Sequence, residues 1–183
     1  MTAMSLSKEL RPMSPIERQT LLAHLHPSPS WLSRLFGMFA KSAEILQGKE
    51  DLEGDCRDGV VEVLTVEVMR YAIGDECNDE GPIYFFEVGQ NDLLVLWGQW
   101  LCDPHVVTSY LLDLDELWEQ NAWFKHFELV RSPSSGIVLS LKSIGRETVS
   151  SVGTVCAGQR LPPQPSAVIP GNLEMLLGDA SRA

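Results

Sequence analysis

The sequence predicts an α+β fold: a mostly antiparallel sheet or small barrel preceded by two N-terminal helices. Apolar residues follow helical spacing up to about residue 50, and from about residue 60 they alternate with polar ones. Helices that precede a run of strands, rather than alternate with them, disfavour a parallel α/β sheet. We expect three segments: a helical segment at 1–50 packing on the body, a β-rich domain at 51–161, and a proline-rich tail with a short helix at 162–183.

The first predicted helix has a clear start signal. Ser14 can cap it, Pro15 suits its first position, and Glu17 completes a capping box. The prolines of the following "HPSPS" end this helix. A second helix is expected over Trp31–Gln47, ending at Gly48.

This second helix carries an apolar stripe at spacings of three and four. The stripe consists of Trp31, Leu32, Leu35, Phe36, Phe39 and Ala43. Aromatic residues opposite basic ones are also typical of a helix lying on an anionic membrane, but Arg34 and Lys41 are few cations for that role. We favour packing of the Trp31–Phe39 stripe on the protein's own sheet or on a second copy as a homodimer, and keep a membrane-peripheral helix as the alternative.

A polar, glycine-punctuated stretch at 48–59 predicts a linker, and period-two alternation over 60–73 predicts a strand. The alternation slips by one residue near Leu64 and Thr65, which indicates a β-bulge. Three polar residues are expected on the solvent face of this strand: Glu62, Thr65 and Glu67.

Two hairpins follow. Strands at 83–88 and 93–101 flank a Gly-Gln-Asn-Asp turn, and their apolar character on both faces indicates a central position in the sheet. Trp97 and Trp100 are expected in or beside the core, and Gly98 indicates a bulge or a close backbone approach.

The second hairpin pairs 124–131 with 137–145 around "SPSSG", a turn sequence with proline and glycine. We also expect a short helix at 115–120, a strand near 149–156 and a final helix at 173–177. The proline-rich stretch before that helix predicts an extended surface tail.

The net charge of the chain and its distribution narrow the kinds of partner that the protein can bind. The 183 residues include 14 basic and 25 acidic ones, giving a net charge of −11. Residues 1–43 carry +3 and residues 44–183 carry −14. Such a surface repels phosphate backbones, so we expect no nucleic-acid partner. The absence of a bilayer-length apolar run and of a secretory h-region, together with four isolated cysteines, predicts a cytoplasmic protein with reduced thiols.

Motifs for chemistry are sparse. Cys102 and His105 form a C-x-x-H pair, with Cys77 and His126 as conceivable further ligands, but a structural zinc site normally shows two closely spaced pairs. The acidic stretch at 74–82 lacks the ligand spacing of an EF-hand. Neither a G-x-S-x-G nor a P-loop pattern occurs. We therefore expect no metal, no cofactor and no assignable catalytic residue.

The chain also resembles a group of bacterial β-rich proteins without an assigned function. "DEGP" at 79–82, "GQWL" at 98–101 and "FELVR" at 127–131 stand where that group has "EDEGP", "GQYL"-like and "FELVR" segments, with Trp100 in place of a more usual tyrosine. The resemblance covers about residues 52–161. It implies a compact β-rich domain and carries no activity.

These observations favour a non-enzymatic, acidic protein-binding module that masks a basic protein, in the manner of an immunity protein or antitoxin. Acidic surfaces attract basic partners, and exposed aromatic residues anchor interfaces. The candidate contact residues are Asp75, Glu76, Asp79, Glu80 and Trp100. An enzyme whose site is assembled from loops, and a membrane-peripheral protein held by the helix around Trp31–Lys41, are the alternatives.

Overall fold

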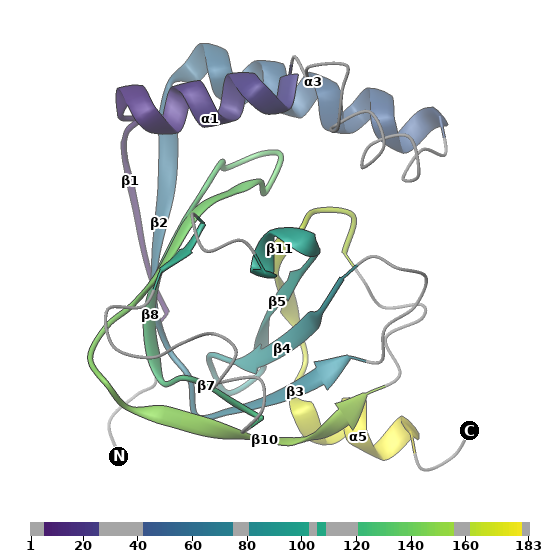
Figure 1. Ribbon diagram of the computed structural model, residues 1–183. Helices are drawn as coiled ribbons and strands as arrows, with labels where there is room; N and C mark the ends of the chain where they lie inside the picture. The colour runs from purple at the N-terminus through teal and green to yellow at the C-terminus, as the bar shows by residue number, and fades with distance from the viewer. Residues whose placement is uncertain are drawn as a thin grey trace.

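The computed structural model describes residues 6–25, 42–74, 81–102, 106–108, 121–155 and 162–180. Two sheets face each other across a shared core, and helices cover part of the outer face of each (Figure 1). This is the α+β, largely antiparallel architecture that the sequence predicts. The described strands form two sheets rather than a closed barrel.

The first sheet, sheet A, has five strands. In spatial order they are β1 (Ser7–Pro12), β2 (Val60–Glu67), β8 (His126–Arg131), β9 (Val138–Ser143) and β6 (Val107–Thr108). Neighbouring strands run antiparallel except β6 and β9, which are parallel.

The second sheet, sheet B, has six strands. In spatial order they are β11 (Ser166–Pro170), β5 (Asp92–Trp97), β4 (Ile83–Glu87), β3 (Arg70–Gly74), β10 (Thr148–Val155) and β7 (Ala122–Phe124). Only β3 and β10 are parallel. The described helices are α1 (Pro15–Leu25), α3 (Ser42–Asp58), α5 (Leu173–Ala180) and the short 3₁₀ helix η1 (Gln99–Cys102).

Aromatic rings from both sheets form the centre of the shared core. The ring centroid of Phe86 lies 5.6 Å from those of Tyr71, Trp123 and Phe127. Phe127 comes from sheet A and the other three from sheet B. These offset and edge contacts add to the burial of the rings themselves.

Each sheet also has an outer core. On sheet A, Val130 packs with Leu21 of α1 and Leu52 of α3, and the two helices lie side by side over one end of the sheet (Figure 1). On sheet B, Phe85 packs with Leu173 of α5. Strand β4 is therefore buried along its whole length, as expected of a central strand.

The predicted linker at 48–59 is wrong, because those residues form most of α3. Leu52 and Cys56, one turn apart, are the side chains that this half of the helix places in the outer core of sheet A. Its remaining face is polar, which gives the segment the composition of a linker. The helix ends at Asp58, and the φ of 66° at the following Gly59 is the left-handed conformation typical after a helix C-terminus.

The expected long strand at 60–73 is two strands that belong to different sheets. The chain crosses from β2 to β3 at Val68 and Met69. The bulge expected at Leu64 is absent, since β2 stays in continuous register with both of its neighbours. Glu62, expected in solvent, is 1% exposed because its side chain points between the sheets to an arginine.

Both hairpins, the strand near 149–156 and the final helix are confirmed. The second strand of the first hairpin is shorter than the expected 93–101, because it ends at Trp97 and is followed by η1. Strands β1 and β11 were missed. Strand β11 pairs with β5, so residues 166–170 are part of sheet B rather than a surface tail. The helix expected at 115–120 and the Trp31–Phe39 stripe lie outside the described residues.

Replacing Phe86 with alanine should lower the free energy of unfolding by about 3–5 kcal/mol, because a completely buried ring is lost from the shared core. Urea denaturation measures the change. Met69→Ala is the control, since Met69 is 53% exposed and should alter stability little. A Phe86 variant as stable as the wild type would contradict the placement of this core.

Candidate functional site

The turn between β8 and β9 is where α3, both sheets and the C-terminal segment meet. The turn is closed by Ser132, whose backbone N–H donates to the carbonyl of Ile137 at 2.9 Å. Gly136 has a φ of 66°, and a Cβ at this position would lie 2.6 Å from Cβ of Gln164. The "SPSSG" turn therefore requires its glycine for both backbone conformation and close approach.

A buried carboxylate fixes this turn to α3. Asp55 is 2% exposed and accepts hydrogen bonds from the backbone N–H of Ser134 at 3.0 Å and of Ser135 at 2.9 Å. The Ser135 hydroxyl donates to the same carboxylate at 2.8 Å and also shares a hydrogen bond with the Ser132 hydroxyl. Because these buried groups satisfy one another, we assign the Ser–Asp cluster a structural role rather than that of a nucleophile and its base.

A buried ion pair is formed by Arg131, the residue directly before this turn. Arg131 donates from Nε to the Glu62 carboxylate at 2.7 Å, and from Nη1 to the carbonyl of Ser166 at 2.7 Å. Lys8 of β1 forms a salt bridge with the same carboxylate. Burial alone would raise the pKa of Glu62, but the hydrogen bonds and charges of Lys8 and Arg131 outweigh it and hold the pKa below its ordinary value.

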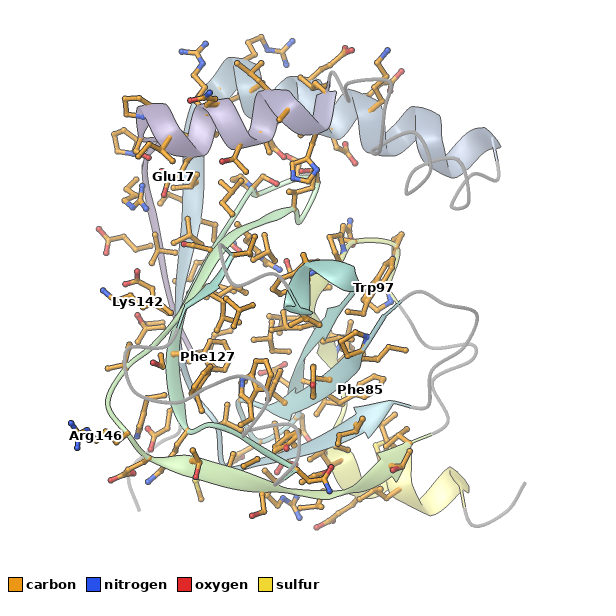
Figure 2. All side chains as sticks on the ribbon, viewed as in Figure 1. Glu17, Phe85, Trp97, Phe127, Lys142 and Arg146 are labelled. Atoms are coloured by element: carbon orange, nitrogen blue, oxygen red, sulfur yellow. The ribbon has the colours of Figure 1, made fainter. Side chains whose placement is uncertain are left out.

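The C-terminal segment is held at two points. The Ser166 hydroxyl donates to the carbonyl of Gly136 at 2.7 Å. The indole N–H of Trp97 is directed at the carbonyls of Gln164, at 2.8 Å, and Pro162, at 3.2 Å. Figure 2 shows Trp97 beside this segment. The first contact joins the β8–β9 turn of sheet A to β11, the edge strand of sheet B, and the second fixes the residues before β11 to the neighbouring strand β5.

The predicted capping box is confirmed at the start of α1. The N–H of Ser14 donates to the Glu17 carboxylate at 2.7 Å, and the N–H of Glu17 donates to the Ser14 hydroxyl at 3.3 Å. Arg11 of β1 also donates hydrogen bonds to this carboxylate, from Nη1 at 2.9 Å and from Nη2 at 2.6 Å. The Arg11 hydrogen bonds, opposed by burial and assisted by Ser14, lower the pKa of Glu17 to about 2.

Of the candidate contact residues, Trp100 is within the described part of the chain. It is half-buried in η1, packs against the shared core and donates its indole N–H to the carbonyl of Trp97 at 2.8 Å. A Cβ at Gly98, whose φ is 122°, would lie 3.0 Å from the Trp100 ring, so the expected close approach is present. The other four candidates, at 75–80, lie outside the described residues.

The conceivable zinc ligands are not assembled in the described part of the chain. His126 is half-buried at the start of β8, with Nε2 3.9 Å from the Glu147 carboxylate. Cys77 and His105 lie outside the described residues, and the side chain of Cys102 is not described. Over the described ranges, no three His, Cys, Asp or Glu side chains are grouped so as to hold a metal ion. Nor is any helix there long and apolar enough to span a membrane.

Comparisons of the chain with protein-family models, with curated proteins and with solved structures found no match.

A double-mutant experiment should measure how the Glu62–Arg131 pair affects the free energy of unfolding. Arg131→Leu leaves a buried carboxylate without its main partner and should lower the free energy of unfolding by about 3–5 kcal/mol. Combining it with Glu62→Leu should recover part of that loss, because no buried charge then remains uncompensated. Chemical denaturation of both variants measures the difference.

Arg146→Leu is the matched control, since Arg146 is exposed and points away from the body in Figure 2. A double variant less stable than Arg131→Leu alone would show that the carboxylate does not need this arginine.

The Glu17 contacts should make stability depend on pH. Because the folded-state pKa of about 2 lies below the ordinary value of 4.5, the contribution is complete above about pH 4.5 and is lost as the pH falls toward 2. Glu17→Gln should therefore be less stable than the wild type at pH 7, and the two should converge near pH 2. Denaturation at pH 7, 5 and 3 measures this trend, and a constant difference across the series would contradict it.

Proposed function

We propose that the chain is a non-enzymatic protein-binding module that uses an acidic surface to engage and mask a basic protein. The observation that carries the proposal is how the acidic residues are divided. Three described acids are buried, and each is committed to a structural partner: Asp55 to the 132–136 turn, Glu62 to Arg131, and Glu87 to Arg70 through two hydrogen bonds of 2.8 and 3.0 Å.

Two acidic segments provide the charge that a partner would meet. The segments 75–80 and 103–119 together contain nine acidic residues and neither lysine nor arginine. The first of them connects β3 to β4, two neighbouring strands of sheet B. The exposed Glu53 and Asp58 of α3 are not counted with them, because Lys49 Nζ and Arg57 Nε of the same helix lie 3.8 and 3.7 Å from their carboxylate oxygens. Opposite charge steers association and discriminates against anionic partners, including nucleic acid and anionic lipid.

The 75–80 acids should matter more for binding than an equal number elsewhere. Neutralising Asp75, Glu76, Asp79 and Glu80 to the corresponding amides should reduce capture of a basic protein from native cell extract, and should leave the melting temperature nearly unchanged. Binding by the wild type should weaken as salt rises, because screening shortens to about 10 Å at 0.1 M. Quantitative affinity capture across a salt series measures both effects.

A matched control neutralises four other exposed acids: Glu50, Glu53, Asp58 and Glu174. Both variants remove four negative charges from the net −11. Loss of the same proteins from both captures would indicate only a general charge effect. Unchanged capture by the 75–80 variant would contradict this segment as the docking surface.

A further inference from the structure

Strand β1 is an open edge of sheet A in the described part of the chain. Among the described strands only β2 pairs with it, and it lies at the left-hand margin of the molecule in Figure 1. All of its residues are exposed except the half-buried Arg11. Leu10 stands out because it is an apolar side chain that is 60% exposed. An edge of this kind presents unpaired backbone groups to another strand.

The hydrogen-bond phase of β1 determines which backbone groups face outward. The N–H of Met13 donates to the carbonyl of Gly59 at 2.8 Å, and this pair continues the register in which Ser7 lies opposite Thr65. In an antiparallel ladder every second residue bonds to the neighbouring strand. The odd-numbered residues of β1 therefore bond to β2, and the even-numbered ones, Leu10 among them, direct their N–H and C=O toward the open edge.

This phase restricts how two copies of β1 can pair. In an antiparallel pair about a two-fold axis, outward-facing residues must lie opposite one another. With Leu10 opposite Leu10 of the second copy, Glu9 of each chain faces Arg11 of the other. Moving the axis by one residue sets Glu9 opposite Glu9 or Arg11 opposite Arg11, two like-charge arrangements that oppose pairing. One register is therefore self-complementary.

We propose that β1 pairs antiparallel with β1 of a second copy of this chain, about a two-fold axis through Leu10, so that two A sheets become one continuous sheet. The two Leu10 residues exchange backbone hydrogen bonds and bury their exposed side chains against each other. The Glu9–Arg11 pairs form on the opposite face, at the positions where cross-strand side chains come closest.

Charged residues and proline on an edge strand ordinarily oppose such pairing. Here the charge of Lys8 is turned toward Glu62 of its own chain, and Pro12 lies at the end of the strand. Arg11 uses Nη1 and Nη2 for Glu17, which leaves Nε for a second carboxylate. A six-residue strand pair is smaller than a standard interface of about 1,200–2,000 Å², so we expect a weak, concentration-dependent dimer.

Charge reversal tests the register directly. Glu9→Arg and Arg11→Glu each place like charges opposite one another in a homodimer, and each should weaken self-association by about tenfold or more. An equimolar mixture of the two variants should recover dimer, because every facing pair is then attractive. Sedimentation velocity over a range from about 10 μM to about 1 mM measures all three samples. Glu53→Arg on α3 is the control for an equal change of charge at an exposed site.

A third variant separates pairing from folding, because Arg11→Glu also removes a contact to Glu17. Leu10→Pro deletes an N–H that faces the open edge and leaves the ladder to β2 in place, so circular dichroism should show a folded protein and sedimentation a monomer. A wild type that remains monomeric up to 1 mM would overturn the proposal. So would a Leu10→Pro dimer, or a mixture of charge variants that stays monomeric.

Discussion

The buried pair between Glu62 and Arg131 is the interaction on which most of the architecture depends. It lies where the two sheets meet, and its arginine also donates to the Ser166 carbonyl of the edge strand of sheet B. Removing both charges from water is costly, and close geometry with further hydrogen bonds offsets that cost. The pair therefore favours this β2–β8 register and this position of β11 together, because displacing either strand would separate the buried carboxylate from its arginine.

The Asp55 carboxylate has the corresponding role for the helical layer. Its three hydrogen bonds fix the C-terminal half of α3 to the 132–136 turn, which in turn contacts the segment before β11 through Gly136. The helix is thereby held rigidly to sheet A, and its charged face is left toward solvent.

Local chemistry made part of this fold predictable. The Ser14–Glu17 capping box and the two hairpins follow from turn and cap residues that act over a few positions. The part of α3 after Gln47 was missed because its apolar face reduces to few side chains. Strand β1 was missed because "SKELRP" has no apolar alternation and becomes a strand only through pairing with β2. The polar cluster could not be predicted, since 69 residues separate Glu62 from Arg131 and 80 separate Asp55 from Ser135. The one local signal was that Glu62 interrupts a period-two apolar pattern. Such an interruption is as typical of a solvent-exposed side chain as of a buried ion pair.

The proposed pairing of β1 determines where the two copies of the proposed acidic segment at 75–80 would lie relative to each other. A two-fold axis that joins two antiparallel edge strands is perpendicular to the sheet, so opposing side chains of both strands lie on the same face. In the proposed dimer both α1–α3 layers would therefore cover one face of the continuous sheet, and both B sheets would lie on the other. Both β3–β4 pairs, between which the proposed acidic segment 75–80 runs in the sequence, would lie on that second face. Two copies of this segment on one face suit a partner that carries two basic patches or is itself two-fold symmetric. For such a partner the second contact becomes intramolecular, and a weak interaction at each copy yields a much tighter complex.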